Sequence, residues 1–151
     1  PMESEYKPGG AGVVSFQAVA GRIKDRGHDD RGRFAYQVFD SGSDFHSVVF
    51  SIYRCNATQP GKSIKTAHHQ QRILQAEQGL RGSTLRFFKL DLIKTIQRLQ
   101  EKYGSNLRPY ILGDFNDCRY IQSAIDEICH EFNLVDIYSY LHPNEADFKT
   151  Y

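Results

Sequence analysis

The apolar residues of the chain fall into short strand-like runs in its first half and into helical spacing in its second half. Residues 11–16, 34–40 and 46–56 are rich in Val, Phe and Ile and are bounded by turn-forming residues, as is typical of strands. The turn at residues 41–44 makes the last two of these runs a hairpin. Residues 18–33 contain three Gly and mixed charges and are expected to form a surface connection. Three consecutive strands are therefore predicted to open the domain.

Helical spacing predominates after residue 65. Residues 83–103 place apolar side chains at steps of three and four, and Gly104 follows as a C-cap. Residues 119–132 repeat this spacing after the apolar run 108–115, which is expected to be a central strand. A helix at 66–80 has a poor apolar stripe and is expected to be largely exposed. Strands followed by helix, strand and helix indicate a layered α/β domain.

Composition limits the classes of protein that need to be considered. The chain has 151 residues, of which 40% are hydrophobic and 13% aromatic, so we expect one globular domain with a core of its own. Three Cys without a C-x-x-C spacing argue against a disulfide framework and a structural zinc site, and they favour a reducing, intracellular setting in the cytoplasm or nucleus. Because no apolar run approaches the ~20 residues that span a bilayer, we expect no membrane association.

Charge is unevenly distributed, although the formal net charge is only +1. Residues 61–108 hold ten Lys and Arg against three acidic residues, whereas residues 109–151 hold two against eight. A basic middle beside an acidic end indicates either a surface that faces a polyanion or two complementary faces that attract each other.

Candidate chemistry begins at "RPYILGDFND", where an apolar run stops at two carboxylates and an amide. Asp114 and Asn116 are two residues apart at a strand end, so their side chains point the same way while Phe115 points into the core. A carboxylate there can accept a proton from a nucleophilic water, and an amide can hydrogen-bond a charged oxygen. The simpler interpretation is an Asx-turn with Asp117 as helix N-cap.

A second strand end offers matching groups. The run "SIYRCN" ends with Tyr53, Arg54 and Asn56, whose hydroxyl, guanidinium and amide are donors suited to phosphate oxygens. If the strands 46–56 and 108–115 are neighbours in the sheet, both clusters meet at one rim. By contrast, the adjacent His68 and His69 lie about 100° apart on a helix and are unsuited to chelating one ion.

These segments resemble the endonuclease/exonuclease/phosphatase superfamily, which includes deoxyribonuclease I, abasic-site endonucleases and the endonuclease domains of non-LTR retroelements. The similarity lies in the order "GRFAYQVFD", "VVFSIYRCN", "QQRILQ" and "RPYILGDFND". The G-D-F-N run is its most specific motif, supported by Tyr-x-x-Asn at a preceding strand end and by a Gly-Arg pair before the strand 34–40. The resemblance implies a deoxyribonuclease I-like four-layer α/β sandwich, of which this chain is the central portion, incomplete at both ends.

The resemblance also implies a Mg²⁺- or Mn²⁺-dependent phosphodiester hydrolase that acts as an endonuclease on nucleic acid, DNA more than RNA. By position, Asp114 would orient or deprotonate the attacking water and Asn116 would stabilise charge on the phosphate, and both lie where some members bind a metal. Tyr53 would hold the phosphate from the other side, and Asn56 and Arg54 would contact the substrate.

The chain also departs from the family pattern. Members carry a metal-binding Glu before the Gly-Gly strand, and Glu3 and Glu5 are too close to Gly9-Gly10 to replace it. Members also close with a Ser-Asp-His run, and none of the six His has that context. The chain as given is therefore expected to be weak or inactive as an enzyme. The alternative is a non-catalytic fragment or descendant that binds nucleic acid or a protein partner.

Overall fold

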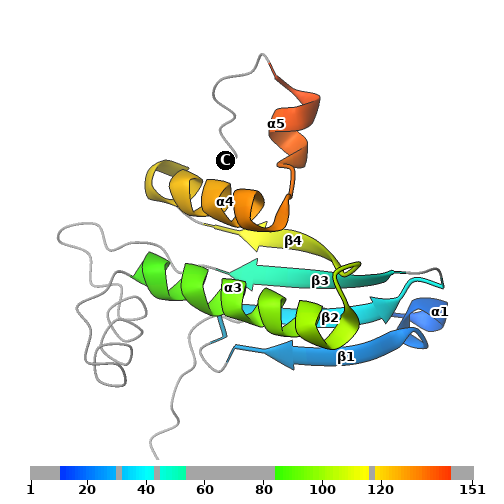
Figure 1. Cartoon of the computed structure of the whole chain (residues 1–151). Coiled ribbons are helices and arrows are strands. Elements are labelled where there is room, and N and C mark those ends of the chain that lie inside the picture. Colours follow the sequence, from blue (N-terminus) through cyan, green and yellow to red (C-terminus); the bar gives the residue numbers. More distant parts are fainter. Residues whose placement is uncertain (1–10, 30–31, 43–44, 54–83, 116–117, 144–151) are drawn as a thin grey trace, which may run out of the picture.

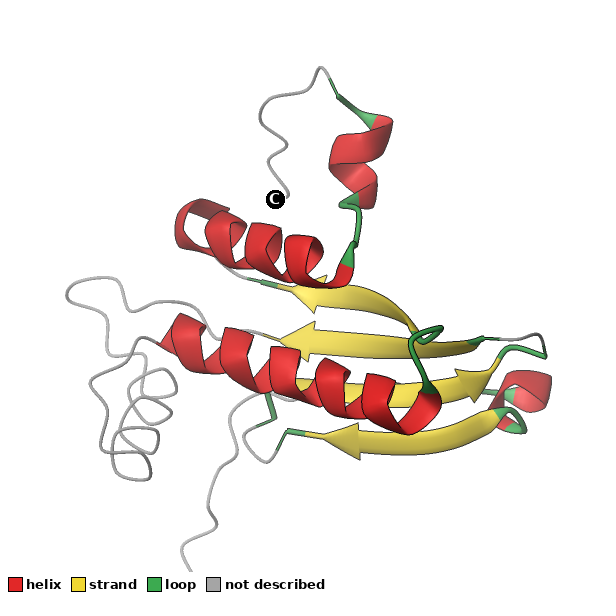
Figure 2. Cartoon of the chain, in the orientation of Figure 1, coloured by secondary structure: helices red, strands yellow, loops and turns green. Residues whose placement is uncertain are grey.

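The protein is a mixed α/β structure in which helices lie along one face of a sheet (Figures 1 and 2). The computed structural model describes residues 11–29, 32–42, 45–53, 84–115 and 118–143. In chain order, the elements are α1 (Gln17–Ala20), β1 (Ile23–His28), β2 (Phe34–Asp40), β3 (His46–Tyr53), α3 (Thr84–Tyr103), β4 (Arg108–Asp114), α4 (Cys118–Phe132) and α5 (Ile137–Leu141).

The four described strands form one sheet in the order β1-β2-β3-β4. β1, β2 and β3 are successive antiparallel neighbours, which confirms the predicted hairpin of β2 and β3. β4 pairs with β3 in parallel, so the chain must return to the other end of the sheet between them, and α3 makes this return. The prediction that β4 is a central strand is wrong for the described sheet, because β4 lies at its edge.

The hydrophobic core lies between the sheet and α3. Alternate side chains of β2 and β3 point to the same face because successive residues of a strand point to opposite faces. Burying each large apolar side chain contributes roughly 1.5–3 kcal/mol. The buried apolar residues on the strands are Phe34, Tyr36, Val38, Val48, Phe50 and Ile52, and those on α3 are Leu92, Ile96 and Leu99.

Both long helices confirm the predictions from apolar spacing. α3 ends where predicted, because Gly104 has φ +89 and its N–H donates to the Gln100 carbonyl oxygen at 2.8 Å. α4 buries Ala124 and Ile128. Polar contacts also link the two helices, since Lys89 pairs with Glu127 and Gln97 Nε2 donates to Glu131 Oε1 at 3.2 Å. The predicted helix at 66–80 lies outside the described residues.

The predicted first strand is wrong, because residues 11–16 are not part of the sheet. They lie instead against the face of β2 that is turned away from α3. Gln37 Nε2 donates to the Val13 carbonyl oxygen at 2.9 Å, and Ser15 Oγ donates to Gln37 Oε1. The polar groups of this segment are thus satisfied partly by a side chain of β2 rather than by a neighbouring strand.

The surface connection predicted for residues 18–33 is also wrong, because it contains the edge strand β1. Exposed and partly buried residues alternate along β1, as in a strand with one wet face. After Ile23, its partly buried positions are polar or small: Asp25 bonds to α3, and Gly27 leaves room for the Tyr36 ring, whose oxygen would lie 2.6 Å from a Cβ at that position. The apolar alternation that identifies β2 is therefore lacking in β1.

Candidate functional site

The two strands that end in candidate residues are neighbours in the sheet. β3 and β4 run parallel, and Tyr53 and Asp114, at their carboxyl ends, are register partners. The strand adjacency on which the convergence of the two clusters depended is therefore present. We call the end of the sheet where β3 and β4 finish the site end, and the end where they begin the opposite end.

Tyr53 and Asp114 lie on the face of the sheet turned away from α3. Ile52 is buried against α3, so the next residue, Tyr53, points to the other face. Leu112, two residues before Asp114, is 60% exposed on that same face. Phe115 packs against the core, as predicted from its alternation with Asp114. A partly buried hydroxyl and an exposed carboxylate thus stand side by side on this face of the sheet.

Gly113 brings the two strand ends close together. A Cβ at Gly113 would lie 2.1 Å from the carbonyl oxygen of Ile52, its register partner. No larger residue fits here unless the strands separate, because the obstructing atom belongs to the backbone of β3. The Gly before Asp114 in the G-D-F-N run therefore has a packing reason as well as a place in the motif.

Three candidate residues cannot be placed relative to this pair. Arg54, Asn56 and Asn116 lie outside the described residues, as does the proposed N-cap Asp117. The chain geometry fixes only that Arg54 directly follows Tyr53, and that Asn116 follows Asp114 by two residues.

A buried cluster of charged side chains lies at the site end and connects the sheet to α3. Arg33 Nε and Nη2 donate to the two carboxylate oxygens of Asp29 at 2.7 and 3.0 Å. Arg33 Nη2 also donates to Asp91 of α3 at 2.5 Å. The side chains of Arg33 and Asp29 are only 4% and 7% exposed, and that of Asp91 is 28% exposed. The cluster therefore joins the segment after β1, the start of β2 and α3.

The charge on Arg33 is maintained in spite of its burial. Burial disfavours a charged guanidinium and by itself lowers the pKa of Arg33, but the hydrogen bonds to Asp29 and Asp91 outweigh this effect, so the pKa lies above its usual range. Among the described residues, Arg33 Nη1 is nevertheless a buried nitrogen without a hydrogen-bond partner. Such an unsatisfied buried donor costs roughly 1–3 kcal/mol.

Sequence patterns gave only part of this cluster. The Gly-Arg pair at 32–33 was noted for its resemblance to a family motif, but its partners Asp29 and Asp91 were not identified. Asp29 lay within a segment expected to be a loop, and Asp91 lies next to the buried stripe of α3 beside Leu92. The available signal was the position of the Asp91 carboxylate at the margin of an apolar helix stripe. This position does not identify the residue with which Asp91 pairs.

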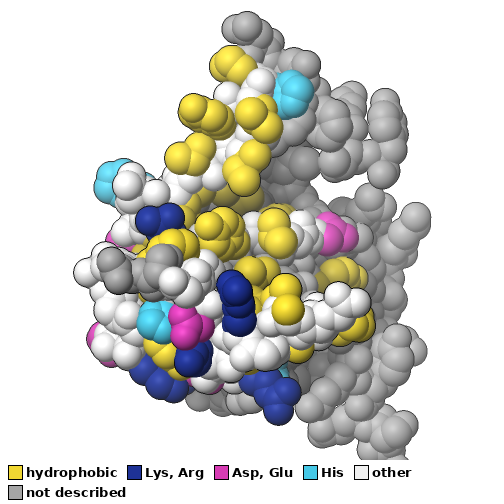
Figure 3. Space-filling view, turned by 90° about the vertical axis from the view of Figure 1, so that its right-hand side faces the viewer, with side chains coloured by type: hydrophobic (Ala, Val, Ile, Leu, Met, Phe, Trp, Pro, Cys, Tyr) yellow, Lys and Arg dark blue, Asp and Glu magenta, His cyan; other side chains and the backbone are white. Residues whose placement is uncertain are grey.

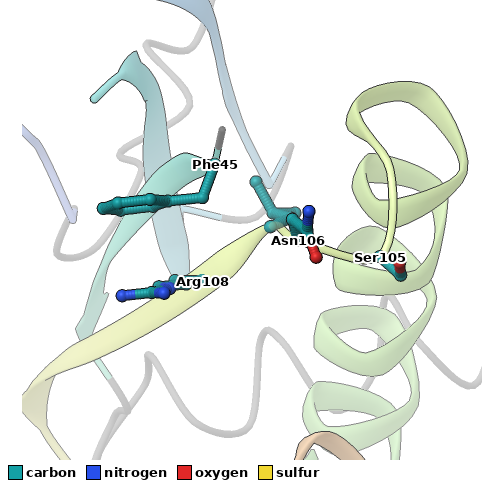
Figure 4. A pocket seen from close by; sticks show the side chains of 5 residues that line it. Phe45, Ser105, Asn106 and Arg108 are labelled. Carbon is teal, nitrogen blue, oxygen red and sulfur yellow. The ribbon is translucent and has the colours of Figure 1, made fainter. Parts of the chain in front are cut away.

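A cavity among the described residues lies at the opposite end of the sheet, far from Tyr53 and Asp114. It has a volume of about 290 Å³ and is lined by Phe45, Ser105, Asn106, Leu107 and Arg108. Figure 4 shows the Arg108 guanidinium stacked on the Phe45 ring, 3.9 Å from its centroid. This stack lies at the start of β4, and the residues that line the cavity offer no general acid or base for hydrolysis.

Exposed apolar side chains are prominent at the opposite end. Figure 3 looks onto this end and shows hydrophobic side chains gathered over α5 and continuing below it. The exposed members in and beside α5 are Val135, Ile137, Tyr140 and Leu141. On the open sheet face, Tyr110 and Leu112 are exposed as well. No helix among the described residues is both long and apolar enough to cross a membrane.

Several basic residues of α3 already have protein partners. Lys89 pairs with Glu127, Lys102 pairs with Asp25, and Arg98 Nη2 donates to the Tyr36 hydroxyl at 3.1 Å. In this part of the chain, the structure therefore favours complementary faces within the protein over a surface that faces a polyanion. Four further basic residues of the segment 61–108 lie outside the described residues: Lys62, Lys65, Arg72 and Arg81.

Metal ligation has one candidate donor in the described part of the chain. Within that part, no group of three or more His, Cys, Asp or Glu side chains is arranged to hold a metal ion. Asp114 nevertheless offers a hard, exposed carboxylate oxygen. Because Mg²⁺ is usually held by one or two carboxylates with water and substrate phosphate, Asp114 fits one position of such a site.

Comparisons of the chain with protein-family models, with curated proteins and with solved structures found no match.

Proposed function

We propose that the chain is the core of a metal-dependent phosphodiesterase that acts as an endonuclease on nucleic acid. The observation that supports it best is the register pairing of Tyr53 with Asp114 at the carboxyl ends of neighbouring parallel strands. Ligands of open α/β sheets bind at the carboxyl ends of strands, and these two residues belong to the two motifs that resemble the endonuclease/exonuclease/phosphatase superfamily. The finer fold that goes with this proposal is the deoxyribonuclease I-like four-layer sandwich.

The proposed chemistry divides the roles between the two strands. The Asp114 carboxylate accepts a hydrogen bond from the attacking water and orients it, or takes its proton. The Tyr53 hydroxyl donates to a non-bridging phosphate oxygen and so holds the phosphate from the other side. Asn116 would stabilise the charge that develops on the phosphate, and Asn56 and Arg54 would contact the substrate backbone.

Asp114 and Asn116 would hold Mg²⁺ or Mn²⁺ at this site. When bound, the ion supplies neutralisation of the negative charge on the scissile phosphate. The residues of the chain then have to place the phosphate and the water in line, which is the task assigned to Tyr53 and Asp114.

A plasmid-nicking assay with Mg²⁺ or Mn²⁺ tests the proposal on the 151-residue chain and on a form extended at both ends. We expect weak nicking by the short chain and stronger nicking by the extended form. Asp114→Ala should lower the rate about 10²–10³-fold, because it removes a group that acts in the transition state. Glu101→Ala, which removes an exposed carboxylate near the carboxyl end of α3, serves as the control and should leave the rate unchanged.

Two results would contradict the proposal. One is that neither form nicks DNA or cleaves RNA although both are folded. The other is that nicking persists undiminished in Asp114→Ala, since the activity would then arise elsewhere. Binding of DNA without cleavage by either form would instead favour the non-catalytic alternative.

A further inference from the structure

We propose that Arg33 is a positioning residue of the candidate site, which holds the end of β3 so that Tyr53 stands beside Asp114. This inference rests on the proposed function, because it concerns the same site. It assigns Arg33 no contact with substrate. Its effect passes through the backbone of Tyr53 and through the elements that its side chain joins.

The first link is a backbone hydrogen bond. The Tyr53 N–H donates to the Arg33 carbonyl oxygen at 2.8 Å, one step beyond the register pair of Phe34 and Ile52. The position of Arg33 therefore determines where the backbone of Tyr53 lies at the site end. Asp114 is one strand away and in register, so a shift of Tyr53 would change the separation of the two candidate groups.

The second link is the side chain, which fixes Arg33 to two other elements. Asp29 follows β1 and binds Arg33 through both carboxylate oxygens, and the Arg33 backbone N–H also donates to Asp29 Oδ2 at 3.2 Å. Asp91 holds the same guanidinium from α3. Since a planar guanidinium presents its donors in a rigid fork, these contacts fix its direction as well as its location.

Stability alone is a poor explanation for this cluster. Buried ion pairs are often no more stabilising than well-packed apolar residues of similar volume, because desolvation offsets much of the attraction. Here the unpartnered Nη1 adds a further cost. What an apolar cluster does not supply is a directional connection between β1, β2 and α3. The role of Arg33 is therefore to fix the relative positions of these elements at the site end.

Amide hydrogen exchange measured by NMR tests the positional claim without any need for activity. Arg33→Met keeps much of the side-chain volume and removes the charge and the donors. We expect the Tyr53 amide to exchange about tenfold faster or more, because its acceptor is no longer held, while amides in the middle of β3 stay protected. Lys102→Met is the matched control, since it removes an α3–β1 ion pair at the opposite end and should leave the Tyr53 amide unchanged.

The kinetic test uses whichever form of the chain is active in the nicking assay. Arg33→Met should lower kcat about tenfold or more with KM nearly unchanged, because misplacing a group by about 1 Å can cost up to 100-fold. Arg33→Lys keeps the charge but not the fork, so it should recover only part of kcat. A residue needed only for folding would instead lower the amount of active protein without changing kcat per folded molecule.

The outcomes separate the two proposals. If no form of the chain is active, the proposed function fails, and the exchange experiment still decides whether Arg33 positions Tyr53. If Arg33→Met does not fold, Asp91→Asn replaces it, because Asp91 is the more exposed partner and its loss leaves the Asp29 contacts in place. The positional claim is overturned if the Tyr53 amide stays fully protected in the folded variant, or if exchange quickens uniformly along β3.

Discussion

The two ends of the sheet are attached to α3 by ion pairs of opposite character. At the site end, Arg33 is almost wholly buried between Asp29 and Asp91. At the opposite end, the cation is exposed instead: Lys102 is 60% exposed and reaches Asp25, which is 24% exposed and also accepts from the Tyr103 hydroxyl at 3.2 Å. Exposed pairs are screened by solvent and contribute little, whereas a buried group that loses its partner is costly. We infer that the site end is held rigidly in one geometry and that the opposite end tolerates change.

Gly113→Ala should have the largest effect, because it acts on the backbone of the site end. The new Cβ would lie 2.1 Å from the Ile52 carbonyl oxygen, and only separation of β3 and β4 relieves that contact. We expect the free energy of unfolding to fall by about 4 kcal/mol or more, as measured by urea denaturation. Gly42→Ala, at a position with φ +68 and open space around it, is the control for backbone strain alone and should cost less.

Asp29→Ala should have the next largest effect, because it leaves the guanidinium of Arg33 buried with only Asp91 as a charged partner. Breaking a buried ion cluster by removing one member typically costs about 3–5 kcal/mol. Urea denaturation of this variant measures the loss, and a double variant with Arg33→Met should recover part of it. A loss below that of Lys102→Met would contradict the contrast between the two ends.

Lys102→Met should change the free energy of unfolding by about 1 kcal/mol or less, because the lysine side of the pair is 60% exposed to solvent. Raising the salt concentration should reduce even this difference between wild type and variant. The measurement is a urea titration at low and high salt. A large effect that salt does not change would mean that the opposite end is as tightly held as the site end.

The smallest expected effect is a dependence on pH at the opposite end. Burial alone raises the pKa of Asp25, but hydrogen bonds from Lys102, the Arg26 N–H and Tyr103 outweigh it, so the pKa lies below its ordinary value. The stabilisation by the Asp25 carboxylate is therefore present above its unfolded pKa and is lost as the pH falls through the lower folded value. Comparison of wild type with Asp25→Asn from pH 5 downward should show the difference in unfolding free energy shrinking. A constant difference would show that the charge of Asp25 is not what stabilises this end.

Apolar periodicity predicted the elements that bury one clear face. α3, α4, β2 and β3 follow this rule. The adjacency of β3 and β4, which was the condition for their polar ends to meet, is present in the structure. β1 does not follow this rule, because two of its three partly buried positions are Asp25 and Gly27, whose partners lie in α3 and β2. Residues 11–16 have strand-like composition, but their polar partner is the side chain of Gln37, which no local pattern reveals.

The candidate site could be predicted only where its residues end apolar runs. Tyr53 and Asp114 met this condition, and the structure places them side by side. Arg33 did not meet this condition. It precedes a strand, and the role of such a charged residue depends on the side chains that surround it in the folded protein. Asp91 lies 58 residues away in sequence from Arg33, so their pairing is a property of the tertiary structure.

The parallel pairing of β3 with β4 also bears on how the chain folds. β1, β2 and β3 pair with their neighbours in sequence, whereas Tyr53 and Asp114 are separated by about sixty residues, and closing so long a loop costs entropy before any contact is gained. The antiparallel strands should therefore form first and β4 should dock afterwards. We expect the candidate site to form only in the last folding step. In a partly folded chain, Tyr53 would already lie in the antiparallel sheet, whereas Asp114 would not yet be beside it.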